Sequence, residues 1–305
     1  MNGFFRRKPI GDGIFTLSVT GGKGGTGKST IAINLAVSFM LDGYRVLLVD
    51  CDVDAPNTAL LLDADFLGER DVNRFLPFFD EEKCVRCGEC VKSCRSHALI
   101  EPEGETPLVF PELCNGCMLC WHVCPADAVR EGYRKVGAVK DFSYRDLDIV
   151  VGELLPNERE AAPIVNSLRE RVEELVRQRS YDVVIVDTAP GIHCGVVRAL
   201  EMTENALAVT EPTPLGAHDL DIILELTSLL GLSSYVVLNR AGIGDAGLVY
   251  NVCERRGVKL LAEIPFDMSL FECYAKSVPV VSGKPSSPSA KAIMRLYEKI
   301  REAMK

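Results

Sequence analysis

Apolar residues recur along most of the chain in short uninterrupted runs, and stretches with a helical repeat lie between these runs. Runs of this kind, rich in Val, Ile and Leu, are typical of strands buried on both faces of a parallel sheet. We expect strands at residues 14–20, 45–50, 147–154, 181–188, 205–211, 234–240 and 259–265, and helices at residues 29–43, 164–179 and 220–231. This alternation predicts an α/β fold with a mostly parallel, doubly wound sheet.

The first expected strand leads into a glycine-rich segment that matches the pattern G-x-x-x-x-G-K-[ST]. A strand before this pattern and a helix after it are the context of a P-loop, which binds nucleotide phosphates through backbone N–H groups. Lys28 is expected to reach the β and γ phosphate oxygens, and Ser29 to ligate Mg²⁺. The predicted nucleotide-binding residues here are Gly22, Gly24, Gly25, Thr26, Gly27, Lys28, Ser29 and Thr30. A mobile glycine-rich turn is the weaker alternative.

Two further strand ends carry carboxylates. Asp187 ends an apolar run and is expected to hold Mg²⁺ directly or through water, with the Gly191 N–H facing a γ-phosphate. Asp50, Asp52 and Asp54 follow another run, and one of them is expected to orient the attacking water. For Asp54, a solvated acid at the sheet edge is an equal alternative.

A second lysine, Lys23, together with D-x-D-x-x-x-P-N at residues 50–57 and D-x-x-P-G at residues 187–191, completes a recognisable set of motifs. The set resembles the deviant Walker A ATPases of the Min/Par/Mrp and nitrogenase iron-protein superfamily. The resemblance implies a homodimer that closes on ATP, in which Lys23 acts on the partner's nucleotide and Lys28 on its own. It also implies a water-orienting Asp52, Asp50 near Mg²⁺, Asn239 at the adenine, and Pro265 and Asp267 beside the base.

Eight of the twelve cysteines form two copies of C-x2-C-x2-C-x3-C. This is the bacterial ferredoxin run, in which the fourth cysteine ligates the other cluster. We therefore predict one [4Fe-4S] cluster on Cys84, Cys87, Cys90 and Cys124, and a second on Cys114, Cys117, Cys120 and Cys94. Zinc is the alternative, although its ligands usually come as separated C-x2-C pairs. The first copy departs from the pattern because Arg95, not proline, follows its last cysteine.

The cysteine motifs interrupt the ATPase pattern. We place an inserted ferredoxin domain at residues 80–133, within an ATPase domain formed by residues 1–79 and 134–305. An insertion of about 50 residues is too small for a substantial apolar core, so the clusters themselves are expected to hold it together. The combination resembles MinD-superfamily ATPases that contain an inserted ferredoxin domain, and the resemblance covers essentially the whole chain.

The four remaining cysteines differ in their surroundings. Cys194 follows Asp187 by seven residues. In this it resembles the cluster-ligating cysteine of the nitrogenase iron protein. It is either a ligand that bridges the dimer or, as we favour, a small interface residue. Cys51, Cys253 and Cys273 are expected to be buried apolar residues, as free cysteine often is.

Net charge and hydropathy limit the partners and the cellular location that we expect for the protein. The net charge of -9 and the pI near 5.1 argue against a broad nucleic-acid surface. No stretch approaches the roughly 20 apolar residues needed to span a bilayer, and no apolar region of a signal peptide follows the first arginines, so we expect a cytoplasmic protein. Residues 289–305 have a helical apolar pattern that we expect to pack on the sheet, with a membrane-surface helix as the alternative.

These features together predict a dimeric Mg-ATPase whose nucleotide state is coupled to two [4Fe-4S] clusters. We favour ATP-gated electron transfer to a partner protein, because permanently ligated clusters are poor cargo and the chain lacks a paired C-x-x-C to bridge a dimer. The alternatives are an ATPase that assembles or delivers clusters, and a redox-sensing positioning protein of the MinD/ParA kind. The expected partners are a second copy and a redox or cluster-acceptor protein; nucleic acid and membrane are not expected.

Overall fold

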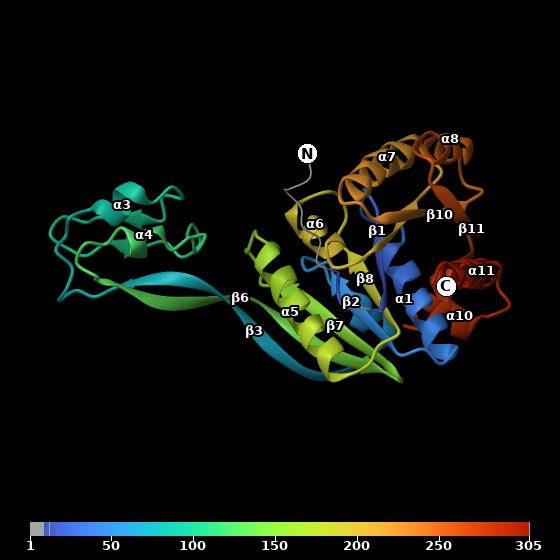
Figure 1. The fold of residues 1–305 in the computed structure, drawn as a ribbon, viewed down its shortest axis with the longest axis horizontal. Coiled ribbons are helices and arrows are strands. Elements are labelled where there is room, and N and C mark those ends of the chain that lie inside the picture. The colour runs from blue at the N-terminus through green and yellow to red at the C-terminus, as the bar shows by residue number, and fades with distance from the viewer. Residues whose placement is uncertain (1–8, 12, 305) are drawn as a thin grey trace.

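The computed structural model describes residues 9–11 and 13–304. Its main body is a nine-stranded sheet with helices on both faces (Figure 1). In spatial order the strands are β11 (Lys259–Pro265), β10 (Ser233–Ala241), β9 (Asn205–Thr210), β1 (Phe15–Thr20), β8 (Val183–Thr188), β2 (Val46–Cys51), β7 (Leu147–Leu154), β6 (Val129–Tyr144) and β3 (Asp65–Phe79). The first seven strands in this order are parallel, and β6 and β3 continue the sheet in antiparallel pairing.

All seven strands expected from the apolar runs are present, and they form the parallel part of the sheet. Except for β11, a partly exposed edge strand, they are largely buried on both faces, which is why their sequences read as continuous apolar runs. On β2, Leu48 faces the core around α1, whereas Leu47 and Val49 face the core around α5. The doubly wound parallel sheet predicted from the sequence is confirmed.

Helices cover the two faces of this sheet (Figure 1). On one face lie α1 (Lys28–Leu41), α2 (Thr58–Leu62), α9 (Met268–Tyr274), α10 (Val280–Gly283) and α11 (Pro288–Ala303), and the other face is covered by α5 (Ala162–Gln178), α6 (Cys194–Leu200), α7 (Pro214–Leu229) and α8 (Gly247–Arg256). The last helix, α11, packs on β11 and α1 and buries Ile293, Leu296 and Ile300 almost completely. The expectation that the C-terminal pattern packs on the sheet is confirmed.

The strands β3 and β6 extend beyond the sheet as a two-stranded ribbon, which we call the arm (Figure 1). The arm carries a small lobe, residues 80–128, at its far end. The lobe contains α3 (Glu89–Ser93), α4 (Leu119–His122) and a hairpin of β4 (Leu99–Ile100) and β5 (Leu108–Val109). The eight cysteines of the two motifs all lie in this lobe.

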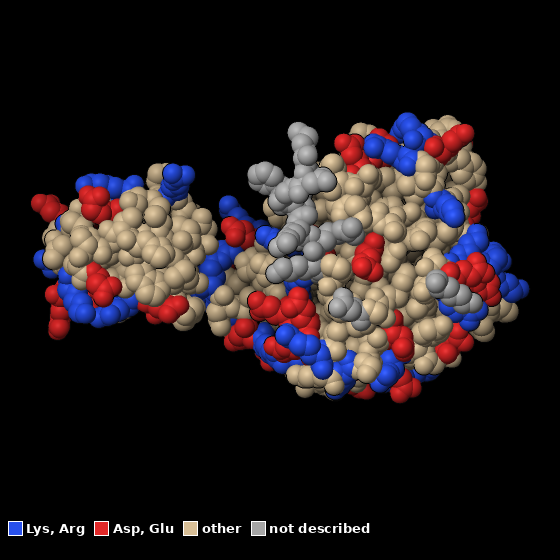
Figure 2. Space-filling model, viewed as in Figure 1, with Lys and Arg blue, Asp and Glu red and all other residues tan. Residues whose placement is uncertain are grey.

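On the face of the molecule in Figure 2, basic and acidic side chains are interspersed over both the main body and the lobe. Within the described residues, no helix is both long and apolar enough to cross a membrane.

Candidate nucleotide site and cysteine lobe

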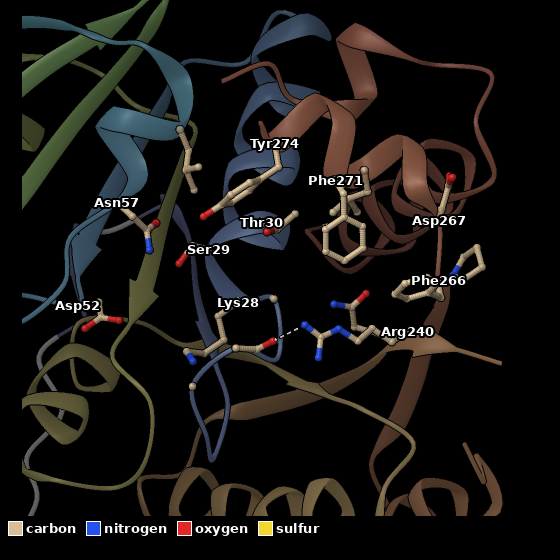
Figure 3. Close-up of a pocket in the computed structure, with 17 residues that line it drawn as sticks. Lys28, Ser29, Thr30, Asp52, Asn57, Arg240, Phe266, Asp267, Phe271 and Tyr274 are labelled. Atoms are coloured by element: carbon tan, nitrogen blue, oxygen red, sulfur yellow. Dashed lines mark hydrogen bonds between the residues drawn. The ribbon is translucent and has the colours of Figure 1, made fainter. Parts of the chain in front are cut away.

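A cavity of about 290 Å³ opens at the carboxyl ends of the parallel strands (Figure 3). This edge is the usual ligand site of an open α/β sheet. One end of the cavity is lined by glycines and polar side chains and the other by aromatic rings. The lining includes Gly24, Gly25, Gly27, Lys28, Ser29, Thr30, Asp52, Asn57, Asn239, Arg240, Pro265, Phe266, Asp267, Phe271 and Tyr274.

The loop between β1 and α1 curls tightly around its own backbone. Gly27 has a φ of 99°, in the left-handed region that favours glycine, and it caps the start of α1. The Lys28 ammonium donates to the Lys23 carbonyl at 3.0 Å, and the Asn239 amide donates to the Thr26 carbonyl at 2.8 Å. This closed loop at a helix N-terminus is the arrangement that binds phosphate.

Lys28 is buried, with only 6% of its surface exposed. Burial lowers the pKa of its ammonium, while the negative charges of Asp187 and Asp52 oppose this shift. A buried cation beside acids is a strong binding partner for phosphate oxygens, because little solvent screens it.

Asp187 is the penultimate residue of β8, and its carboxylate is fully buried. Both of its oxygens lack a hydrogen-bond partner; the Ser29 hydroxyl is near enough to favour the charged form but is not in good bonding geometry. Burial first, and then the charge of Asp50 on the adjacent strand, raise the pKa of Asp187 well above its usual range. Unpartnered buried carboxylate oxygens are costly, so the pair Asp187 and Ser29 fits a site for a cation such as Mg²⁺.

Asp50 organises the loop that follows β2. One carboxylate oxygen accepts the Asp52 N–H at 3.0 Å, and the other accepts the N–H groups of Asn57 and Thr58 at 3.1 and 3.0 Å. Burial raises the pKa of Asp50, and these hydrogen bonds partly offset the rise. Because its oxygens are engaged in this way, contact between Asp50 and Mg²⁺ stays a prediction.

Asp52 lines the cavity at the edge of the same loop. Burial and the nearby charge of Asp50 raise its pKa to about 6, although Lys28 pulls it down. A general base or water-orienting carboxylate works best when its pKa lies near the working pH. The geometry and the pKa both suit the role expected for Asp52.

Lys23 points to its own subunit in this structure. Its ammonium pairs with Glu211, a 7% exposed residue just after β9. Arg240 also pairs with Glu211 at 2.9 Å and donates to the Gly25 carbonyl at 2.9 Å (Figure 3). The sequence singled out neither Glu211 nor Arg240, because both meet the loop through contacts that are distant along the chain.

The far end of the cavity is apolar. Phe266 faces it from the turn after β11, and Phe271 and Tyr274 face it from α9 (Figure 3). Aromatic faces of this kind suit a nucleotide base. Asp267 borders the cavity, but its carboxylate points away from it. One oxygen caps α9 by accepting the Ser269 N–H at 2.9 Å, and the other accepts the Ser289 N–H of α11 at 3.0 Å. Base contact by the Asp267 side chain therefore stays a prediction.

Neither Gly191 nor Cys194 lines the cavity. Gly191 follows β8 and donates its N–H to the Gly21 carbonyl at 3.1 Å, so binding a γ-phosphate would require this bond to open. Cys194 begins α6 and is exposed. Its role as a dimer-bridging ligand stays a prediction. Cys51, Cys253 and Cys273 are buried, as expected.

In the lobe, the two cysteine motifs adopt the same backbone path. Matching positions of the two copies have positive φ: Arg86 (54°) and Gly116 (71°), Gly88 (70°) and Met118 (62°), and His97 (52°) and Asp127 (48°). The fourth cysteine of each copy accepts a backbone N–H on its sulfur at 3.3 Å, from Ala98 to Cys94 and from Ala128 to Cys124. The two copies therefore share their turns and an N–H bond to sulfur, a kind of contact that also occurs at iron–sulfur clusters.

The four cysteines predicted for the first cluster line one small pocket in the lobe. Cys84, Cys87 and Cys90 come from the first motif and Cys124 from the second. Sequence spacing alone placed these residues together, and the fold brings them to the same space. On the other side of the lobe, Cys120 is close enough to Cys114 and Cys117 for their charges to raise its pKa, which burial raises most. Within the described residues, no group of three or more His, Cys, Asp or Glu could hold a single metal ion.

The apolar core of the lobe is small. Its buried members are Phe75 and Phe79 of the arm, Leu99 and Val129, with parts of four of the cysteines packed around them. The Phe75 ring also stacks on Trp121 at 5.9 Å between centroids. Such a core is too small to stabilise a domain alone, which agrees with a structural contribution from bound clusters.

The parallel sheet, the closed loop after β1 and the buried acid at the end of β8 define a P-loop nucleotide-binding protein. Residues 17–280 match the family model of the CobQ/CobB/MinD/ParA nucleotide binding domain, and the chain belongs to this family. It is thus a P-loop ATPase of the MinD/ParA type.

Relatives extend over nearly all of the chain. An uncharacterized protein of Methanocaldococcus jannaschii is 33% identical, and the match covers 86% of this chain and 90% of the relative. An iron-sulfur cluster carrier protein of Pyrococcus horikoshii is 23% identical over 95% of this chain and 87% of the relative. The structure of the septum site-determining protein MinD from Pyrococcus horikoshii, complexed with Mg-ADP, superposes with a TM-score of 0.62 at 21% identity over 95% of this chain and 97% of that one. This last likeness shows the shared fold.

Proposed function

We propose that this chain is a homodimeric Mg-ATPase whose nucleotide state controls two [4Fe-4S] clusters, and that the clusters pass electrons to a partner protein. The observation that carries the proposal is the small pocket shared by Cys84, Cys87, Cys90 and Cys124, on a lobe attached to a P-loop body. The second cluster is assigned to Cys114, Cys117, Cys120 and Cys94. Bound clusters would supply one-electron chemistry, and the eight cysteines would hold them.

The nucleotide site supports the ATPase part of the proposal. Lys28 and the N–H groups of the loop after β1 would hold the phosphates, and Ser29 and Asp187 would hold Mg²⁺, which typically takes one or two protein carboxylates together with phosphate and water. Asp52 would orient the attacking water. Asn239, Pro265 and the aromatic rings at the far end of the cavity would enclose the base.

Electron transfer is favoured over cluster delivery by the way the cysteines are placed. Each proposed cluster draws ligands from both motifs, so neither cluster can leave unless both motifs release it. An exposed, paired ligand set would suit a delivered cluster better. Delivery remains the second candidate, because one relative is named as an iron-sulfur cluster carrier protein. A positioning function is the third, suggested by the MinD fold.

The first experiment is a redox titration of the anaerobically purified protein, followed by EPR, with Mg-ATP, with Mg-ADP and without nucleotide. A cluster potential that depends on the nucleotide supports gated electron transfer. Equal cluster potentials in all three nucleotide states would favour cluster delivery instead. Delivery would be tested by transfer of iron and sulfide to an apo acceptor protein. A protein that contains zinc and no iron would overturn the proposal.

The proposed action of Lys23 on the partner's nucleotide can be tested by mixing two inactive variants. In a dimer of Lys23→Ala with Asp52→Asn, one of the two sites would have an intact Asp52 from its own chain and an intact Lys23 from the partner. An equal mixture should recover about a quarter of the wild-type hydrolysis rate, because half of the dimers are mixed and each has one complete site. If Lys23 acts only within its own chain, mixing will recover nothing.

A further inference from the structure

Two ion pairs join the arm to the segment between β7 and α5, residues 155–161, which we call the junction loop. Arg74 of β3 pairs with Glu160 at 3.1 Å, and Arg134 of β6 pairs with Glu158, with one of their two hydrogen bonds at 3.2 Å. The Arg74 side chain is only 11% exposed, whereas Glu160 is 54% exposed. Arg74 is therefore fixed between the lobe and the main body, and Glu160 is the partner that solvent can replace.

The other side of Arg74 contacts the second cysteine motif. A methyl group placed on Gly116 would meet the Arg74 Cγ at 2.6 Å and its Cδ at 3.1 Å. Gly116 lies between Cys114 and Cys117, which are ligands proposed for the second cluster. The neighbouring Phe75 stacks on Trp121, next to Cys120. The arm thus packs the aliphatic part of a nearly buried Arg74 side chain against the turn proposed to hold the second cluster, while its guanidinium pairs with Glu160.

The junction loop is also tied to the nucleotide site. Leu154, the last residue of β7 before this loop, donates its N–H to the Val53 carbonyl at 2.9 Å, and Val53 directly follows Asp52. The next N–H, of Leu155, donates to the Val136 carbonyl of β6 at 3.0 Å. A movement of the Asp52 segment on nucleotide binding would therefore act first on the loop that carries Glu158 and Glu160.

We propose that Arg74 and Glu160 form an electrostatic link through which the nucleotide site sets the potential of the second cluster. This inference rests on the proposed function, because it requires a cluster at that site. Reduction makes a cluster with four thiolate ligands more negative, so a nearby cation favours the reduced form and raises the potential. Glu160 cancels part of the Arg74 charge while the ion pair is closed. Opening the pair by movement of the junction loop leaves the cation free to raise the potential.

The test is the same EPR redox titration, applied to three variants and to the wild type in each nucleotide state. The second cluster is identified as the signal that disappears in Cys120→Ser. Without nucleotide, Glu160→Gln should shift the potential of this cluster upward, and Arg74→Met should shift it downward. Arg74→Lys keeps the charge and should restore most of the wild-type value. Both Glu160→Gln and Arg74→Met should lose the shift that Mg-ATP produces in the wild type.

Glu174→Gln is the matched control. Glu174 of α5 pairs at 2.6 Å with Arg70, which lies on β3 like Arg74 but in the part of the strand that belongs to the sheet. It should retain both the resting potential and the shift. If Glu160→Gln retains the wild-type potential and shift while both clusters are present, the link is refuted and the proposed function stands. The link is also refuted if the potential of the second cluster in the wild type does not depend on the nucleotide. A protein without iron–sulfur signals would instead refute the proposed function itself.

Discussion

Replacing Asp52 by asparagine should make the nucleotide-free protein more stable while removing most of its ATP hydrolysis. Burial and the charge of Asp50 raise the pKa of Asp52 from 3.8 to about 6. The folded state thus disfavours the ionised carboxylate relative to the unfolded state. The resulting loss of folding stability is absent below about pH 4, where Asp52 is protonated in both the folded and the unfolded state. It is complete above about pH 6, where Asp52 is ionised in both states.

The size of the effect follows from the shift. About 2 pKa units correspond to about 3 kcal/mol, since one unit is worth about 1.4 kcal/mol. Solvent screens a carboxylate that is only partly buried, so we expect a gain of about 1–2 kcal/mol for Asp52→Asn at pH 8. For a chain of this size, that gain raises the Tm by about 2–8 °C. Hydrolysis should fall by about 100-fold or more if the carboxylate orients water.

The assay is thermal unfolding of wild type and variant, without nucleotide, at pH 4 and pH 8. Asp54→Asn is the matched control, because Asp54 lies two residues further along the same loop but is exposed, and its replacement should change stability by less than about 0.5 kcal/mol. The reasoning fails if Asp52→Asn is no more stable than wild type at pH 8. It also fails if the gain is as large at pH 4, because a gain without pH dependence would not come from the charge.

Three further outcomes test other parts of the structure. Gly27→Ala should destabilise the protein by about 1–3 kcal/mol in thermal unfolding, because residue 27 has a φ of 99° and its new methyl group would meet the Asn239 amide nitrogen at 2.3 Å. Gly24→Ala is the control: a methyl group there meets nothing within 4 Å, so stability should change little. Cys124→Ser should lose about half of the bound iron by elemental analysis, as expected for one of two clusters, while the buried Cys253→Ser should retain it. Phe271→Ala should weaken ATP binding by about 1–3 kcal/mol in calorimetry through lost stacking on the base, and an unchanged affinity would place the base elsewhere.

The main sheet could be predicted from sequence because its strands are buried on both faces. The resulting apolar runs matched β1, β2, β7 to β11 with ends within two residues. The phosphate-binding loop could also be predicted from the sequence, because its glycines and lysine have a fixed spacing. Both signals are local, so no knowledge of distant contacts was needed.

The arm was not predicted, and its sequence shows why. In β3 most side chains before Val72 are exposed, and charged residues interrupt the alternation of apolar positions. Pro77 within the strand also argues against a sheet, although β3 is an edge strand, where a missing N–H is tolerated. Its pairing with β6 joins residues that are at least 50 positions apart along the chain, which no local sequence pattern can predict.

The same limit applied to the roles of single residues. Glu211 contacts Lys23 across 188 positions, and Arg74 contacts Glu160 across 86, so neither pair could be read from spacing. Asp267 is different, because an aspartate before a helical segment is a common N-cap signal. Its capping of α9 was therefore open to prediction from the sequence.

The features that destabilise the fold without ligands lie at the expected ligand sites. Asp187 is buried without a hydrogen-bond partner, Lys28 is buried with its pKa lowered, and the lobe has few buried apolar residues of its own. The large cores on the two faces of the sheet offset these costs and hold the charged residues in place. A cation and phosphates at the loop after β1, and clusters in the lobe, would each stabilise the folded state through differential binding. Because the junction loop contacts both the arm and the strand end at Asp52, stabilisation of one site can alter the other, which is the physical requirement for coupling between them.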